Sequence, residues 1–248
     1  MKALGVARQS KTASPRGERA SLLIEHENLD DKIYARLKRM IADGQLVPGQ
    51  RILQEKLARD MGVSRTPLVN ALKRLAQERL VEWVSRRGIY VKRFSMREMA
   101  QLFEVREGLE PIAARLAATR IAPAEVRAFK KLFDGFSEKP SAAEVRRYLK
   151  CDQKFHWRLV ELTENPHLAA AMESVNMMIS AYQVGVPRSL AESLPEHQAI
   201  LAALGRRDPD ASEAAMRVHN RRSVERLWQR ARSEEGEGSA REVPPATR

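Results

Sequence analysis

The chain has 248 residues, of which 43% are hydrophobic, 31% are charged and 5% are aromatic. This hydrophobic fraction excludes wholesale disorder, and the balance of many charged and few aromatic residues favours helices over an all-β sandwich. The single cysteine, Cys151, excludes an internal disulfide framework and a cysteine-rich zinc finger. No apolar run approaches the roughly 20 residues that cross a bilayer, and residues 1–19 lack the apolar segment of a secretory signal. We therefore expect a soluble, cytoplasmic protein without a membrane partner.

The positive charge is concentrated in the N-terminal third of the chain, although the formal net charge of +12 belongs to the whole. Residues 1–93 contain 20 Lys and Arg against 10 Asp and Glu, whereas residues 94–248 contain 24 against 22. This asymmetry indicates that one domain binds a polyanion and the other does not. A solvated basic face without a partner is the alternative.

The N-terminal segment, residues 1–27, is polar and is predicted to be a disordered arm. Residues 28–93 follow the order helix, helix, helix, β-hairpin. Apolar residues at spacings of three and four, Gly44 and Gly62 after the first two helices, and Gly88 in a tight turn support this order. The predicted helices cover about 30–43, 54–61 and 64–80, and the extended runs cover 81–84 and 89–92.

After Phe94 the pattern is almost purely helical. Prolines stand at or near the predicted helix boundaries, and short connections between long helices favour an antiparallel bundle. The six predicted helices lie near 96–120, 123–136, 141–163, 167–185, 190–205 and 209–231. Residues 232–248 are rich in Gly, Glu and Pro, so we expect a disordered tail there.

A helix-turn-helix pattern spans the second and third predicted helices. Ala58 is small enough for the next helix to pack closely, Gly62 turns the chain, and Val63 fills the gap between the helices. The third helix is then a recognition helix, whose N-terminal end enters the major groove. A helical hairpin that merely packs is the alternative.

Polar residues stand where this geometry needs DNA contacts. Arg65 at the start of the third helix could bind guanine O6 and N7, while Ser64 and Thr66 could donate to phosphate oxygens. The hairpin turn with Arg86, Arg87 and Gly88 would be a wing, and its glycine allows a close approach to the DNA backbone. Trp83 is expected to pack the hairpin against the domain core.

These motifs resemble the winged-helix domain of GntR-family bacterial transcription regulators. The matching segments are Asp43-Gly44-x-Leu46-x-Pro48-Gly49, Leu57-Ala58-x-x-Met61-Gly62-Val63-Ser64-Arg65-Thr66-Pro67 and Arg86-Arg87-Gly88-Ile89-Tyr90-Val91. The resemblance implies binding of double-stranded DNA, with Arg51, Arg65 and the wing at Gly88 at DNA-contact positions. Val69 stands where the family usually has an arginine, and Asn70 could bind adenine instead.

Four residues of the C-terminal part have the types that bind a metal ion. Asp152 and His156 are four apart on one predicted helix, so their side chains share a face, and His197 and His219 follow on later helices. Neutral imidazoles with a carboxylate suit Zn²⁺, Ni²⁺ or Mn²⁺, and such a site can leave a coordination position open. Because ligating histidines must be neutral, metal binding should weaken as the pH falls through about 6.5. Spacing alone leaves open that these residues are merely solvated.

The C-terminal part also resembles a known domain, the FCD effector-binding domain of the FadR subgroup, over about residues 96–231. The matching segments are Val105-Arg106-x-x-Leu109-Glu110, Asp152-x-x-Phe155-His156, Glu196-His197-x-x-Ile200-Leu201 and Met216-x-x-His219. Six predicted helices are similar to the shorter, VanR-like branch. The resemblance implies a divalent metal inside the bundle, held by the Asp and three His, that helps to bind a small carboxylate effector. It disfavours acyl-CoA.

By the same resemblance, Arg106 matches an arginine that points into the effector pocket. A surface arginine paired with Glu110 is the alternative. Asn176, Tyr182 and Arg188 are further candidates for the pocket lining.

The predicted fold is mostly α, with an N-terminal winged helix-turn-helix of three helices plus a β-hairpin. It is joined to an all-α antiparallel bundle of about six helices. The predicted function is a DNA-binding transcription regulator, homodimeric, bound to an inverted-repeat operator and controlled by a carboxylate effector. One alternative is a metal-dependent enzyme in which the Asp and three His activate water. Another is a nucleic-acid packaging protein that binds all DNA alike.

Overall fold

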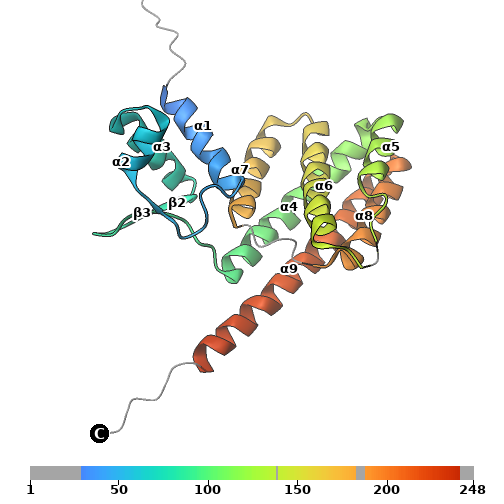
Figure 1. Ribbon diagram of the computed structural model, residues 1–248. Coiled ribbons are helices and arrows are strands. Elements are labelled where there is room, and N and C mark those ends of the chain that lie inside the picture. The colour runs from blue at the N-terminus through green and yellow to red at the C-terminus, as the bar shows by residue number, and fades with distance from the viewer. Residues whose placement is uncertain (1–28, 138, 183–187, 241–248) are drawn as a thin grey trace, which may run out of the picture.

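The computed structural model describes residues 29–137, 139–182 and 188–240, and it is mostly helical (Figure 1). The N-terminal elements are α1 (Leu29–Ala42), β1 (Arg51–Ile52), α2 (Gln54–Met61), α3 (Arg65–Gln77), β2 (Val81–Val84) and β3 (Gly88–Val91). The C-terminal helices are α4 (Met96–Arg120), α5 (Pro123–Leu132), α6 (Ala142–Leu162), α7 (Pro166–Tyr182), α8 (Leu190–Gly205) and α9 (Pro209–Ala240). The predicted fold class is confirmed. The arm predicted over residues 1–27 lies outside the described residues.

The N-terminal domain is a winged helix. Its three helices enclose a core whose fully buried members include Leu37, Leu68, Leu72 and Leu75. The sheet has the order β1-β3-β2 with antiparallel pairing, so the short strand β1 adds an edge to the predicted hairpin. The hairpin extends away from the helices as a wing (Figure 1).

Local sequence signals determine where the C-terminal helices begin. Capping boxes start α4, α6 and α8: in each, a serine side chain accepts from a backbone N–H three residues on, and the glutamate there accepts from the serine backbone N–H. The three pairs are Ser95 with Glu98, Ser141 with Glu144, and Ser189 with Glu192. A proline begins α5, α7 and α9, where its missing N–H leaves no bond unmade.

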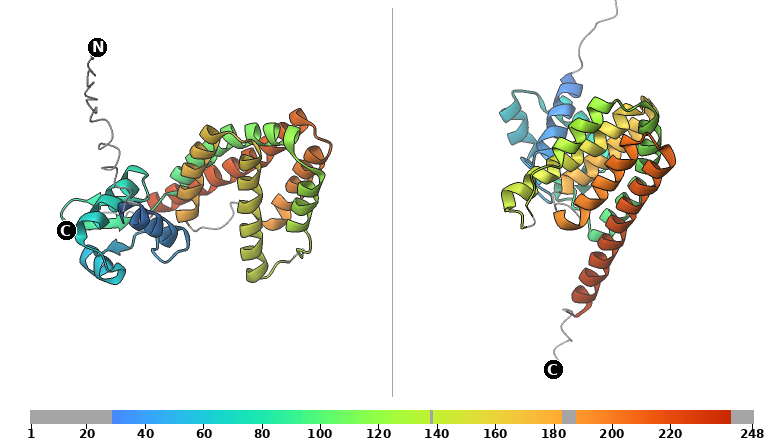
Figure 2. Two further views of the ribbon diagram at one scale, coloured as in Figure 1. Left: turned by 90° about the horizontal axis from the view of Figure 1, so that it is seen from above. Right: turned by 90° about the vertical axis from the view of Figure 1, so that its right-hand side faces the viewer.

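The long helices α4 and α9 run side by side along the molecule, with the winged helix at one end and the rest of the bundle at the other (Figures 1 and 2). Ala113, Ala114 and Ala117 of α4 are buried, and such small side chains allow neighbouring helices to approach closely. An aromatic cluster fills the far end of the bundle. Phe155 packs edge-on against Phe129 and Phe133, with ring centroids 5.0 and 5.3 Å away.

Helix α7 joins the two domains. The Nζ of Lys38 on α1 lies 3.2 Å from the carboxylate of Glu173 on α7. Met177 and Met178 of the same helix pack against the winged-helix core. The face of α7 that carries these residues therefore belongs to the domain junction.

Two sequence expectations are wrong. Helix α9 continues to Ala240, so the tail expected over 232–248 is helical in its first part; the Arg97–Glu235 ion pair joins this extension to the start of α4. Residues 241–248 lie outside the described residues. The Trp83 side chain is 49% exposed, although Val81, Ile89 and Val91 of the same hairpin are buried in the winged-helix core. In the part of the chain that the structure describes, none of the helices combines the length and apolar character needed to span a membrane.

Candidate functional site

The predicted recognition helix has an open polar face. Gly62 ends α2 in the left-handed conformation at φ 66°, and buried Ala58 lets α3 pack against α2. Arg65 and Thr66 are exposed at the N-terminal end of α3. Ser64 precedes them in an extended conformation, and its hydroxyl does not cap the helix. This end of α3 therefore presents the donors that the sequence predicts for DNA.

Two side chains of this face already have partners within the chain. Arg65 Nε donates to Gln54 Oε1 of α2 over 3.2 Å, which holds the guanidinium near the turn between the helices. Asn70 Nδ2 donates to Asp30 Oδ2 of α1 over 3.0 Å, so an adenine contact requires this bond to break. Lys73, one turn further along α3, is also exposed, and the sequence analysis did not consider it. Its spacing of seven residues from Thr66 places the two side chains on one face of the helix.

The wing brings a second group of arginines together. Arg86 and Arg87 are exposed at the hairpin turn, where Arg86 has φ 60° and Gly88 has φ 109°. A Cβ on Gly88 would meet Arg51 Nε at 3.4 Å, so the side chain of Arg51 crosses this glycine closely. The structure thus joins Arg51 of β1 to the wing.

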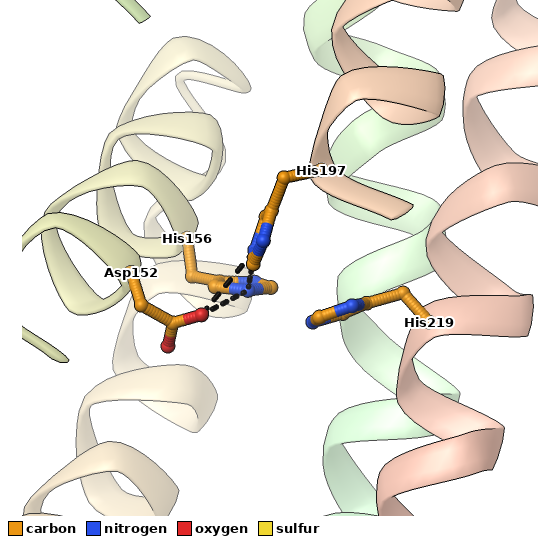
Figure 3. Close-up of side chains that lie close together, drawn as sticks. All are labelled: Asp152, His156, His197 and His219. Carbon is orange, nitrogen blue, oxygen red and sulfur yellow. Dashed lines mark hydrogen bonds and ion pairs between the residues drawn. The ribbon is translucent and has the colours of Figure 1, made fainter. Parts of the chain in front are cut away.

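The structure brings Asp152, His156, His197 and His219 together inside the bundle (Figure 3). One ligand atom from each lies within 4.8 Å of every other. Asp152 and His156 come from one face of α6, while α8 and α9 supply the other two (Figure 3). His197 Nε2 lies 3.2 Å from Asp152 Oδ1 and 3.4 Å from His156 Nε2. The sequence spacing predicted only the first pair; tertiary packing provides the rest.

Each histidine has a different group at its outer nitrogen. His197 Nδ1 is 2.9 Å from the Tyr148 hydroxyl, and His219 Nδ1 is 2.9 Å from Glu196 Oε2. A proton on Nδ1 that is donated outward leaves Nε2 unprotonated and facing the cluster, as a metal ligand requires. Figure 3 shows the ring of His219 presenting a nitrogen to the other three residues.

The third histidine approaches a buried carboxylate. His156 Nδ1 lies 2.9 Å from Glu110 Oε2, but the two groups are not aligned as a hydrogen bond. Both atoms are fully buried, and among the described residues neither has another hydrogen-bond partner. A rotation of the imidazole that turns Nδ1–H onto this oxygen would satisfy both atoms.

The cluster holds its charges close together. Burial lowers the pKa of His156, but Glu110 and Asp152 outweigh burial and raise it to about 9. Burial would raise the pKa of Asp152, but His156 and His197 hold it well below its usual range. Burial lowers the pKa of His197, and it lowers that of His219 to about 4. The site therefore has one proton to give up near neutral pH.

A small cavity opens beside the cluster. Its volume is about 150 Å³, and its lining is Arg106, Asp152, Gln153, His156, Trp157, Asn176, Ile179 and Ser180. Arg106 is buried and pairs with Glu110, with Nη2 2.6 Å from Oε1. The two interpretations of Arg106 are therefore not exclusive, since it pairs with Glu110 and also lines the cavity.

The three other residues that the sequence analysis expected in the pocket lining differ in where the structure places them. Asn176 faces the cavity, whereas Arg188 forms a two-pronged ion pair with Glu196, the partner of His219. The side chain of Tyr182 lies outside the described residues. Sequence analysis missed the outer partners of the histidines, although Glu196 and Glu110 stand within the motifs that carried the resemblance and Tyr148 is four residues before Asp152.

Comparison with known proteins matches two family models to separate parts of the chain. The model for "Bacterial regulatory proteins, gntR family" matches residues 29–91, and the FCD domain matches residues 101–222. The Nta operon transcriptional regulator of Aminobacter aminovorans is 30% identical over 182 residues, 73% of this chain and 85% of that protein. The HTH-type transcriptional regulator YdhC of Bacillus subtilis is 28% identical over 203 residues, 79% of this chain and 89% of YdhC.

Solved structures have the same fold. The structure of E. coli McbR/YncC matches with a TM-score of 0.64 at 20% sequence identity, covering 82% of this chain and 98% of that one. A GntR regulator from Rhodococcus sp. RHA1 matches with the same TM-score, covering 81% and 97%. The relatives are named as transcriptional regulators and not as enzymes.

Proposed function

Since the chain belongs to the GntR family of bacterial regulators and has an FCD domain, it is a DNA-binding transcriptional regulator, and we propose that a small carboxylate controls its operator binding. The carboxylate would bind beside a divalent metal ion in the C-terminal domain. One observation carries this proposal: Asp152 and His156 of the metal-ligating cluster line, together with Arg106, a cavity of about 150 Å³. The protein would act in the cytoplasm, where bacterial DNA lies.

The four clustered residues fit a divalent metal ion. Asp152 offers a carboxylate oxygen, and the three histidines offer nitrogens that lie within 4.8 Å of that oxygen and of one another. Outer partners fix histidine orientation in most metal sites, and Tyr148 and Glu196 occupy these positions here. This donor set suits Zn²⁺, Ni²⁺ or Mn²⁺. When bound, the ion supplies a Lewis-acidic position that a carboxylate oxygen can occupy.

The charges around the cavity favour an anion of this kind. With neutral imidazoles, Asp152 and Glu110 contribute two negative charges, against one positive charge from Arg106 and two from a divalent ion. One effector carboxylate neutralises the remaining positive charge, and a guanidinium suits a carboxylate geometrically.

The size and lining of the cavity restrict the effector further. Its volume of about 150 Å³ lies below the roughly 300 Å³ at which pockets for drug-sized ligands begin, so a long acyl chain does not fit. Gln153, Asn176 and Ser180 offer hydrogen bonds to a second polar group of the effector, while Trp157 and Ile179 provide an apolar wall.

On the DNA side, we infer that Arg65 contacts a base, with Ser64 and Thr66 on phosphates. The DNA backbone near Gly88 of the wing would be contacted by Arg51, Arg86 and Arg87. Asn70 would contact a base only after it leaves Asp30.

A homodimer on an inverted repeat completes the proposal. Val105 and Ile112, seven residues apart on α4, are 46% and 43% exposed, and a Cβ on Gly108 between them would meet no atom within 4 Å. Val218 on the adjacent helix α9 is 49% exposed. A second copy of the chain would bury this apolar face, and its two-fold symmetry would be matched by the operator.

The metal-dependent effector is tested with protein purified without chelators. Metal analysis should find one divalent ion per chain, natively or after addition of Zn²⁺, Ni²⁺ or Mn²⁺. A thermal-shift screen of small mono- and dicarboxylates should then find a ligand that raises the unfolding temperature of metal-loaded protein more than that of EDTA-treated protein. The same ligand should change binding to an operator obtained by in-vitro selection. Absence of metal uptake would refute the metal part, and an unchanged operator affinity would refute effector control.

A further inference from the structure

We propose that Glu110 is a positioning residue that orients His156 toward the metal and is itself held in place by Arg106. The inference rests on the proposed function, since it concerns the same metal centre. It assigns a role to a residue of α4 that is not one of the four clustered ligands.

Both oxygens of the Glu110 carboxylate face a functional side chain. Oε1 accepts from Arg106 Nε over 2.9 Å and from Nη2 over 2.6 Å. Oε2 lies 2.9 Å from Nδ1 of His156. The side chains of Glu110 and His156 are each 2% exposed and that of Arg106 is 8% exposed, so water does not compete for these contacts.

The arrangement constrains both partners at once. A buried ionised carboxylate is costly unless it is paired, and Arg106 provides the pairing through one edge of its guanidinium. This leaves the other edge of the guanidinium for the cavity that Arg106 lines. The second carboxylate oxygen then stands at a fixed place beside His156 Nδ1, and the outer partner of a histidine sets the direction of its ligating nitrogen.

The position of Glu110 in the sequence makes this geometry possible. Arg106 and Glu110 are four residues apart on α4, so their side chains meet on one helical face. His156 approaches that face from α6. The ligands themselves come from α6, α8 and α9, and Glu110 brings a side chain of α4 to the metal centre as well.

The experiment compares two isosteric changes on the same helix in the full-length protein. Glu110→Gln keeps the shape but loses the charge and one acceptor oxygen. Glu107→Gln is the matched control, because Glu107 also pairs with an arginine, Arg221 at 3.0 Å, away from the metal-ligating cluster. Zn²⁺ affinity is measured by competition with a chromophoric chelator. We expect a loss of about 10- to 100-fold for Glu110→Gln and wild-type affinity for the control.

Two further measurements separate positioning from mere structural support. The visible spectrum of bound Co²⁺, which reports its ligand geometry, should change in Glu110→Gln and not in Glu107→Gln. Arg106→Met should be non-additive with Glu110→Gln in Zn²⁺ affinity, because Arg106 acts on His156 through Glu110; any direct repulsion of the ion by Arg106 cancels in the double-mutant cycle.

Each outcome bears on a different claim. Wild-type Zn²⁺ affinity and Co²⁺ spectrum in Glu110→Gln would overturn the positioning role and leave the proposed function intact. Additive effects of the two substitutions would overturn the link to Arg106. A wild-type protein that binds neither ion would overturn the metal site and this inference together. If Glu110→Gln fails to fold in EDTA, Glu110→Asp replaces it: the shorter carboxylate keeps the charge for Arg106 but withdraws from His156, so affinity should again fall.

Discussion

Binding of Zn²⁺ should release close to one proton per chain at pH 7, because one of the three histidines carries an extra proton before the ion binds. Burial lowers the pKa of His156, but the facing carboxylates of Glu110 and Asp152 outweigh it and raise that pKa to about 9. Burial lowers the pKa of His197, and that of His219 to about 4, so both are neutral at pH 7. A bound Zn²⁺ would therefore displace a proton from His156 alone.

The magnitude follows from this single displaced proton. Between about pH 6.5 and 9, each unit of falling pH should cost about 1.4 kcal/mol of binding free energy, which is a tenfold loss of affinity. Affinity should thus fall about 30-fold from pH 8 to pH 6.5. Three imidazoles with ordinary pKa values near 6.5 would give almost constant affinity from pH 8 to 7 and a steeper loss below. The structure consequently moves the onset of the loss from about 6.5, as the sequence predicts, to about 9.

Isothermal titration calorimetry in buffers of different ionisation enthalpy counts the released protons, and chelator competition at pH 6, 7 and 8 gives the slope. Exposed His167 on α7 offers a control, since His167→Gln should leave the proton count unchanged. Release of less than about half a proton at pH 7, with release appearing only below pH 6.5, would refute the protonated state of His156. The same pKa predicts that the unfolding free energy of EDTA-treated protein contains a His156 contribution that is complete below about pH 6.5 and lost as the pH rises through about 9.

Four further substitutions test other features of the molecule. Arg65→Ala should reduce discrimination between the selected operator and scrambled DNA by about 1–3 kcal/mol. Lys73→Ala should weaken binding to both DNAs alike and lower the slope of log affinity against log salt by about one. If fluorescence anisotropy gives Arg65→Ala the wild-type ratio of operator affinity to scrambled-DNA affinity, a base contact by Arg65 is excluded. Tyr148→Phe removes the hydroxyl at His197 Nδ1. Zn²⁺ affinity should then fall about 10- to 100-fold, and the unfolding free energy should fall by about 1–3 kcal/mol. An unchanged affinity in chelator competition and an unchanged stability in urea denaturation would contradict a role for Tyr148 in holding His197. Ile112→Glu should yield monomers in light scattering, and an intact dimer would place the interface elsewhere.

Local signals in the sequence predicted most of the fold. The glycine at Gly62 and the small Ala58 identify the helix-turn-helix because their steric roles depend on near neighbours only. The end of α9 was missed for the same reason: residues 232–240 contain two glycines, which disfavour a helix locally. The helix is anchored to α4 just before this stretch, where Ala231 lies in a buried cluster with Met96 and Met99, and Glu235 pairs with Arg97 at the surface.

In the candidate metal centre, too, the sequence predicted the local contacts and not the tertiary ones. Helical spacing places Asp152 beside His156, but it says nothing about which groups stand behind the histidines. Tyr148, Glu196 and Glu110 reach them from α6, α8 and α4, and only tertiary packing brings these atoms within 2.9 Å of an imidazole nitrogen. Residue spacing also does not predict which partner a side chain on a helix reaches. The hydrogen bond from Asn70 Nδ2 to Asp30 Oδ2 of another helix is an example.

If an effector in the cavity controls operator binding as proposed, the position of α7 suggests how its signal would reach the winged helix. Asn176 on this helix lines the cavity, while Glu173 pairs with Lys38 of α1 and Met177 packs against the winged-helix core. A ligand changes a conformational equilibrium only through a difference in its affinity for the two states. Contacts between an effector and Asn176 would supply such a difference if α7 shifts, and any shift of α7 alters its contacts with α1. Because α1 packs on α3, a shift of α7 would reach the predicted recognition helix through directly packed helices.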